Sequence, residues 1–206
     1  MALSGRRAQA AENDERILAA AREVFVADPG APIAAVAERA GVGIGALYRR
    51  YGSKEELLRR LCGEGLQRYI AAVEAALADD DDPWEAFARF MRRIVDEDTH
   101  SLTLRLAGTF TPTEELNREG ERAGALNAEL FERVRGALRP GLEVNDLSFV
   151  FEQIASVRVG DPARTNELRH RYLAIQLDGL RAGAQLPGAA PTWEENAGRW
   201  QPQESR

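Results

Sequence analysis

Apolar residues recur at helical spacing along almost the entire chain, and this periodicity limits the fold more than any other feature. Ile17, Ala21, Val24 and Phe25 form one such stripe, and similar i, i+3, i+4 patterns return in segment after segment. Alternating strand patterns rich in Val, Ile and Thr are nearly absent, and no Asn-Gly or Asp-Gly hairpin signal lies between such segments. The sequence therefore predicts an all-α fold.

Start and stop signals divide this pattern into about nine helices. Ser53-Lys54-Glu55-Glu56 is a capping box, and Asp82-Pro83 and Asp161-Pro162 place proline at a first helical position. The expected helices cover residues 12–26, 32–40, 45–51, 53–78, 83–96, 113–138, 145–159 and 162–182, with short helix or irregular chain over 99–110. Three prolines in residues 183–206 predict a loose tail, which Trp193 and Trp200 can still dock.

The charge is distributed unevenly along the 206 residues. The net charge is −6, but residues 1–62 carry ten Arg and Lys against eight Asp and Glu, whereas the remainder carries 17 against 25. A mildly basic head on an acidic body is expected where only the head meets a polyanion. One cysteine and two distant histidines argue against a zinc site. Without a secretory signal or an apolar run of about 18 residues, the expected location is the cytoplasm, with no membrane partner.

Residues 33–61 carry the most informative pattern, which is a helix-turn-helix. Two short helices are separated by Gly41, and the small side chains of Ala37 and Ala40 let them cross closely. Val36 and Leu47 are expected to fix the second helix to the helix before it. Such a helix is narrow enough to enter the major groove of DNA, where every base pair presents a distinct set of donors and acceptors.

The same stretch resembles the TetR family of transcriptional regulators. The resemblance covers about residues 12–62, and its specific part is Ala-Gly-Val-x-x-x-x-Leu-Tyr-x-x-Tyr-x-Ser-Lys-Glu-x-Leu, from Ala40 to Leu57. It implies a three-helix DNA-binding head over residues 1–52. A long helix from residue 53 would link this head to a helical-bundle body over residues 53–206, which binds ligand and forms a dimer.

The resemblance also implies which residues meet DNA. By position these are Gly43, Ile44, Gly45, Ala46, Tyr48, Arg49, Arg50 and Lys54. Lys54 and the Tyr48 hydroxyl would contact phosphates, and the two arginines would contact guanine edges or phosphates. Tyr51, near the end of its helix, is expected in the core. Pro32 stands where the family often has Thr or Ser, and Gly43 and Ile44 replace commoner polar residues, so any base contact there would be apolar.

The body is rich in aromatic residues, and a ligand cavity is one interpretation of them. The candidate lining residues are Trp84, Phe87, Phe90, Met91, Phe110, Phe131 and Phe151, with Arg105, Thr109 and Gln153 as polar candidates. For any one of the apolar residues, ordinary core packing is the simpler explanation. The last two long helices also offer a dimer surface, for which the candidates are Phe149, Ile154, Val157, Tyr172, Ile175, Leu177 and Leu180.

These features favour a TetR-like regulator that is not an enzyme and has no cofactor. It would bind a palindromic operator as a homodimer, act as a repressor, and be released by an apolar or amphipathic small molecule. The alternatives are a helical small-molecule-binding protein and a DNA-binding activator without ligand control. Catalysis finds no support, because there is no glycine-rich phosphate loop and Cys62 lies on a leucine-rich helix without a histidine near it in sequence.

Overall fold

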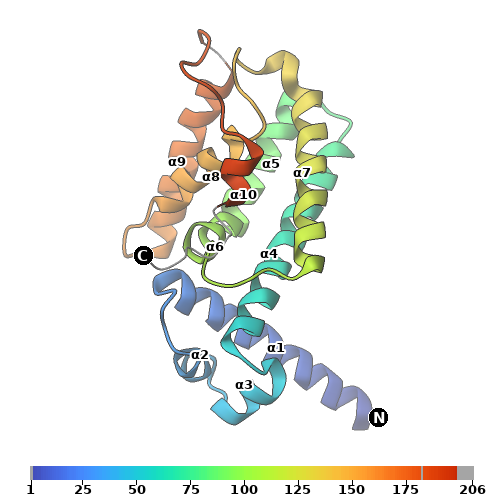
Figure 1. The fold of residues 1–206 in the computed structure, drawn as a ribbon, viewed down its shortest axis with the longest axis vertical. Coiled ribbons are helices and arrows are strands. Elements are labelled where there is room, and N and C mark those ends of the chain that lie inside the picture. Colours follow the sequence, from blue (N-terminus) through green and yellow to red (C-terminus); the bar gives the residue numbers. More distant parts are fainter. Residues whose placement is uncertain (1, 182, 199–206) are drawn as a thin grey trace.

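A computed structural model describes residues 2–181 and 183–198, and within them the chain is helical without a β-strand (Figure 1). The elements are α1 (Ala2–Ala27), α2 (Ile33–Ala40), α3 (Ile44–Tyr51), α4 (Lys54–Leu77), α5 (Pro83–Glu97), α6 (Thr99–Leu106), α7 (Glu114–Val134), the 3₁₀ turn η1 (Arg135–Ala137), α8 (Asp146–Ser156), α9 (Pro162–Arg181) and α10 (Trp193–Gly198). The predicted all-α fold is confirmed.

The helices form a small head and a larger body, joined by α4. In Figure 1, α1, α2 and α3 make the lower part of the molecule, and α4 rises from them into a bundle with α5, α7, α8 and α9. α6 lies at the junction, where it packs against α1 and α4 from one side and α8 from the other. This arrangement places α3 at the far end of the head, away from the body.

Side-chain caps begin the helices where the sequence predicted them. The Ser53 hydroxyl accepts a hydrogen bond from the Glu56 amide at 3.0 Å, and the Asp82 carboxylate accepts from two amides at the start of α5. The Thr113 hydroxyl and the Asp161 carboxylate do the same for α7 and α9. Each cap satisfies an amide that has no partner inside its helix.

Both ends of the chain differ from the expectation. α1 begins at Ala2 instead of residue 12, because its first residues favour a helix by intrinsic propensity although they carry no apolar stripe. The tail contains α10, which is opened by a reciprocal cap: the Thr192 amide donates to the Glu195 carboxylate, and the Glu195 amide donates to the Thr192 hydroxyl. Asn196 donates to the Asn145 carbonyl and is buried. Trp200 lies outside the described residues.

Two apolar clusters form the interior. The head cluster joins α1, α2 and α3 to the first turns of α4 and to α6, with Phe25, Leu47, Leu57 and Leu106 fully buried in it. The body cluster joins the second half of α4 to α5, α7, α8 and α9. α4 therefore contributes to both clusters, and the domain boundary between residues 52 and 53 stays a prediction.

Gly41 makes the turn between α2 and α3. Its φ of 66° lies in the left-handed region, which is unfavourable for residues with a Cβ. Its amide donates to the Glu38 carbonyl, and the Val42 amide donates to the Ala37 carbonyl at 3.0 Å. This tight ending of α2 sets the direction in which α3 leaves and completes the helix-turn-helix.

Candidate functional site

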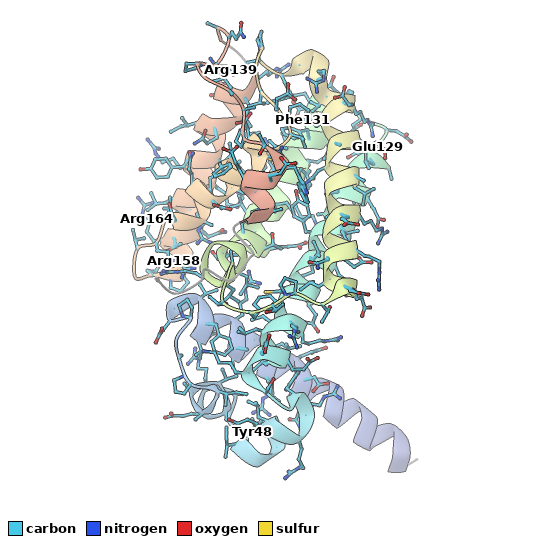
Figure 2. All side chains as sticks on the ribbon, viewed as in Figure 1. Tyr48, Glu129, Phe131, Arg139, Arg158 and Arg164 are labelled. Atoms are coloured by element: carbon cyan, nitrogen blue, oxygen red, sulfur yellow. The ribbon has the colours of Figure 1, made fainter. Side chains whose placement is uncertain are left out.

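One face of α3 is held by the core and the other is open to solvent. Leu47 and Tyr51 are buried beneath the helix, whereas Ile44 and Tyr48 are 42% and 48% exposed. The remaining α3 residues predicted to meet DNA, with the N-cap Gly43, are exposed as well: Gly43, Gly45, Ala46, Arg49 and Arg50. Figure 2 shows Tyr48 at the end of the head remote from the body. The structure therefore brings these seven residues together on one accessible surface.

The two tyrosines of α3 have different environments. Tyr51 packs in the head core as predicted, and burial, aided by the nearby Asp14 carboxylate, raises the pKa of its hydroxyl to about 12. Tyr48 lies three residues before Tyr51, and its ring is at the surface. Tyr48 is thus the aromatic hydroxyl of this helix that is accessible to a partner.

Two of the predicted DNA-contacting cations are engaged inside the head. Arg50 forms a forked pair with the Asp14 carboxylate of α1, in which its Nε lies 2.7 and 3.0 Å from the two oxygens. Lys54 Nζ donates to the Pro29 and Ala31 carbonyls, both at 2.8 Å, and lies 5.0 Å from the centre of the Phe25 ring. Lys54 therefore ties the α1–α2 connection to the start of α4.

Arg49 differs from every other cation in residues 12–62. The others bind carboxylates or carbonyls of the chain itself, and they are Arg16, Arg22, Arg39, Arg50, Lys54, Arg59 and Arg60. Among the described residues Arg49 has no ion pair or hydrogen-bonding side-chain partner, and its guanidinium lies beside Gly45, one turn earlier. Arg49 is thus the cation of this segment that is available to an external anion.

The body aromatics are core residues in this structure. The cluster of the body holds Trp84, Phe87, Phe90, Met91, Phe131 and Phe151, each with at most 7% of its surface exposed. Phe110 does not join them, because the chain turns back after α6 and Phe110 packs into the head cluster. Of the polar candidates, Arg105 is exposed, Thr109 donates to the Leu106 carbonyl, and Gln153 bonds to Gln176. The ligand-binding role of these residues stays a prediction.

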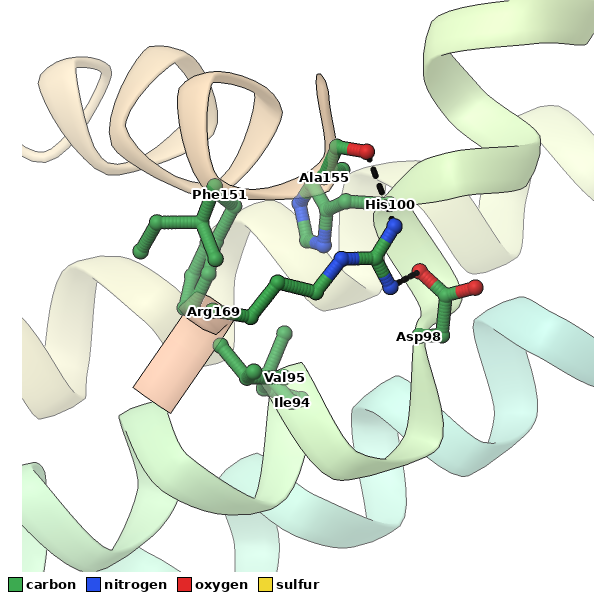
Figure 3. A pocket seen from close by; sticks show the side chains of 8 residues that line it. Ile94, Val95, Asp98, His100, Phe151, Ala155 and Arg169 are labelled. Carbon is green, nitrogen blue, oxygen red and sulfur yellow. Dashed lines mark hydrogen bonds and ion pairs between the residues drawn. The ribbon is translucent and has the colours of Figure 1, made fainter. Parts of the chain in front are cut away.

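A small cavity lies in the body at the end nearest the head. It has a volume of about 10 Å³, which is room for about one water molecule. Its floor is apolar, with Ile94, Phe151 and Ile154, and Asp98 and Arg169 lie at its polar side (Figure 3). This cavity is therefore too small for a metabolite as it stands. A wider cleft of about 410 Å³ lies at the surface between the head and the loop after α6, lined by Pro29, Lys54, Glu55, Leu58, Gly108, Thr109, Phe110 and Thr111.

An ionic network beside the small cavity was missed by the sequence reasoning. Asp98, whose φ of 49° is unusual for a residue other than glycine, accepts from Arg169 at 2.7 Å and from the Ser101 hydroxyl. Arg169 also donates to the Ala155 and Val157 carbonyls at the end of α8. Arg22 of α1 donates to the carbonyls of Glu97 and Asp98. No sequence signal marks this site, because its members lie far apart in the chain.

The expected dimer surface is only partly exposed. Ile154, Leu177 and Leu180 are buried in the body cluster, so the prediction that they form a surface is wrong. Tyr172 and Ile175 are 46% and 59% exposed on the outer face of α9. Gly179 continues the same stripe, and a Cβ there would meet nothing within 4 Å. Phe149 and Val157 are half-buried on and just after α8.

The helix-turn-helix matches a known protein family. Residues 17–61 match the model of bacterial regulatory proteins of the tetR family. Solved structures agree over most of the chain: a TetR transcriptional regulator of Streptomyces coelicolor is 28% identical, with 82% of this chain and 99% of that chain covered and a TM-score of 0.53. A TetR regulatory protein of Mycobacterium vanbaalenii is 27% identical, covers 85% and 99%, and has a TM-score of 0.56.

These matches support a TetR-family transcriptional regulator. TetR regulators are generally DNA-binding proteins without enzymatic activity, so the chain is a DNA-binding transcriptional regulator. The TetR-like regulator LfrR of Mycobacterium smegmatis, solved in complex with proflavine, shares the fold at 21% identity, with 79% and 95% of the two chains covered and a TM-score of 0.60. No curated protein sequence matches the chain. Among the helices described, none has the length and apolar character needed to cross a membrane.

Proposed function

We propose that this TetR-family protein is a homodimeric repressor that inserts α3 of each protomer into the major groove of a palindromic operator. The observation that carries this proposal is the open face of α3, where Tyr48 and Arg49 are accessible while Leu47 and Tyr51 anchor the helix below. A rigid helix with a free guanidinium and a free phenol can position itself on phosphates and read base edges.

Some residues of this face would contact DNA, and others would hold α3 in position. Arg49 would donate to a guanine edge or a phosphate, and the Tyr48 hydroxyl would donate to a phosphate. Gly43 lies in open space, and Gly45 has only the Arg49 guanidinium beside it, so the DNA backbone can approach this end of α3 closely. Arg50 and Lys54 would act mainly by holding α3 and the α1–α2 connection in place.

Dimer formation would use the exposed apolar stripe of α9. Tyr172, Ile175 and Gly179 lie on one face, and the glycine allows a second helix to approach. Two-fold pairing through this stripe would set the spacing of the two heads, which must fit half-sites one helical turn or a multiple apart. Release by an effector would favour a spacing that no longer fits them.

The test is selection of bound fragments from a random DNA pool by the purified chain. The expected result is one palindrome with half-sites about 10 base pairs apart, or a multiple of that distance. Tyr48→Phe and Arg49→Gln should each weaken binding to the selected fragment, whereas Arg118→Gln, which removes a 68% exposed guanidinium on α7, should leave binding nearly unchanged. A pool that shows no enrichment would refute the proposal, and asymmetric single sites would refute the dimer.

The small size of the body cavity favours one alternative, a DNA-binding regulator without ligand control. A cavity of about 10 Å³ cannot hold a metabolite unless the body opens. Under this alternative, the selected fragment would stay bound whichever small molecule is added. An effector that releases the fragment and makes Trp84 fluorescence change would exclude it, because Trp84 is buried in the body cluster.

A further inference from the structure

Two arginines from different helices pair with a single carboxylate, Asp98, at the junction of head and body, and two further arginines lie near them. Asp98 Oδ1 lies 2.7 Å from Arg169 Nη1, and Asp98 Oδ2 lies 3.7 Å from Arg22 Nη2. Arg158, in the connection between α8 and α9, and Arg105, in the last turn of α6, add two more cations (Figure 2 labels Arg158). Asp98 thus faces more than one guanidinium group.

The pKa shifts of Arg158 and Arg22 show which charges act on these two arginines. Burial lowers the pKa of Arg158, and Arg169 and Arg105 lower it further, while Asp98 opposes them. Burial also lowers the pKa of Arg22, again with Asp98 acting in the opposite direction. Among the charges of the described residues that act on Arg158, Asp98 is the one carboxylate. One acid therefore serves as counterion to several guanidinium groups.

The neighbouring acids have other partners. Asp96 lies 2.6 Å from His170 Nε2, and Glu97 accepts from Arg93 at 2.8 Å. Arg105 and Arg158 have no hydrogen bond or ion pair among the described residues, and both side chains reach solvent. An anion that reached this junction would therefore meet guanidinium groups with free donors.

The small cavity places an apolar surface next to these charges. Figure 3 shows Arg169 and Asp98 on one side of it, with Phe151 and Ile94 on the other. The His100 ring stacks on Phe151 with the ring centres 4.5 Å apart. A molecule with an anionic end and an apolar remainder would fit this site, with its anion at the arginines and its apolar part against Phe151 and Ile94, provided that the body opens to admit it.

We propose that the junction is the effector site, and that it takes an amphipathic molecule whose terminal carboxylate or phosphate binds Arg158 and Arg169 in place of Asp98. Binding of the anion does not depend on the proposed function, whereas its effect on DNA binding does. Once Asp98 loses Arg169, one of the contacts that fix α9 to the α5–α6 corner is removed, and the Asp96–His170 pair and the Arg169–Ser101 hydrogen bond remain. Because the same corner holds Arg22 of α1, weakening it would let the head turn relative to the dimer helices.

Calorimetric titration of the full chain with four eight-carbon probes tests the site without DNA. The probes are octanoate, octyl phosphate, octanol and octylammonium, and acetate reports the anionic group alone. Octanoate or octyl phosphate should bind at least about tenfold more tightly than octanol, and the better of the two identifies the oxyanion. Equal binding of octanol or octylammonium, or no binding by either oxyanion probe, would overturn the proposal.

Two variants locate the binding. Arg158→Gln removes an exposed guanidinium with no intramolecular partner among the described residues, and should weaken the better probe about threefold to tenfold. Arg118→Gln on α7 makes the same change of charge at a 68% exposed position and should change nothing. Asp98→Asn keeps a residue that tolerates the left-handed backbone, removes the competing charge, and should strengthen binding about tenfold. Equal effects of Arg158→Gln and Arg118→Gln would refute this location.

Release of the selected DNA fragment is measured separately. If octanoate binds with the expected variant pattern but does not release DNA, the anion site stands and its part in ligand control fails. If the chain binds no DNA fragment at all, the proposed function fails while the anion site is still decided by the titrations.

Discussion

The pairing of cations within the head leads to a prediction about neighbouring arginines. Arg49 and Arg50 are adjacent and both exposed, and the sequence gives no reason to separate them. In the structure Arg50 is neutralised by Asp14, whereas Arg49 has no carboxylate partner among the described residues. We expect Arg49→Ala to reduce the salt dependence of DNA binding, and removal of the whole Arg50–Asp14 pair to leave it almost unchanged.

The size of the effect follows from counterion release. Each phosphate contact contributes about 0.9 to the slope of log K against log salt concentration. One Arg49 contact in each half-site gives about 1.8 for a dimer, so a fourfold rise in salt would cost the wild type about 12-fold more affinity than the variant. The Arg50–Asp14 pair is a surface ion pair, with 61% and 22% of the two side chains exposed, and its loss should cost about 1 kcal/mol of unfolding free energy or less.

Fluorescence anisotropy with a labelled duplex, from about 50 to about 200 mM salt, measures both slopes. The comparison is between Arg49→Ala and the double variant Asp14→Ala with Arg50→Ala, which removes one charge of each sign. Urea unfolding checks that both variants are folded. Equal slopes for Arg49→Ala and the wild type would refute a phosphate contact by Arg49, and a loss of slope in the double variant would refute the assignment of Arg49 as the available cation.

Further predictions concern the stability of the head. Leu47→Ala should lower the unfolding free energy by about 3 kcal/mol in urea, because the side chain is fully buried beneath α3, and DNA affinity should fall with it. The hydrogen bond from Arg50 lowers the pKa of Asp14, so this pair stabilises the fold above about pH 4, and the contribution is lost as the pH falls through the lower folded pKa. Acid melts of the wild type and Arg50→Gln should therefore converge at low pH, and a constant difference would contradict this. Burial raises the pKa of Cys62 to about 12, so a thiol reagent at neutral pH should label it much more slowly than it labels a free cysteine, because little of the thiol is ionised.

The sequence predicted those parts of the fold that depend on local signals. The caps at Ser53 and Asp82 and the turn at Gly41 are determined by residues close to them in sequence, and the structure confirms them. The cap that opens α10 is equally local, since Thr192 and Glu195 have the required spacing, but the three prolines nearby pointed to a loose tail. The alternation of buried Leu47 and Tyr51 with exposed neighbours on α3 also follows from helical spacing.

What the sequence could not predict depends on contacts between distant residues. Whether an arginine is free or paired is decided by the partner that the fold brings to it, and Asp14 lies 36 residues before Arg50. Ile154 looks like a surface residue only until the packing of α8 against its neighbours is known. The network of Asp98 and Arg169 joins positions 71 residues apart and therefore leaves no pattern in the sequence.

If the effector binds at the body cavity, as we propose, the small size of that cavity would also limit how fast the protein responds. A molecule that needs more room than one water has to wait until the bundle opens, however abundant that molecule is. Above a certain supply, the delay between the signal and the change in gene expression would then be set by the opening motion of the bundle, so substitutions that loosen its packing would shorten that delay at the expense of thermal stability.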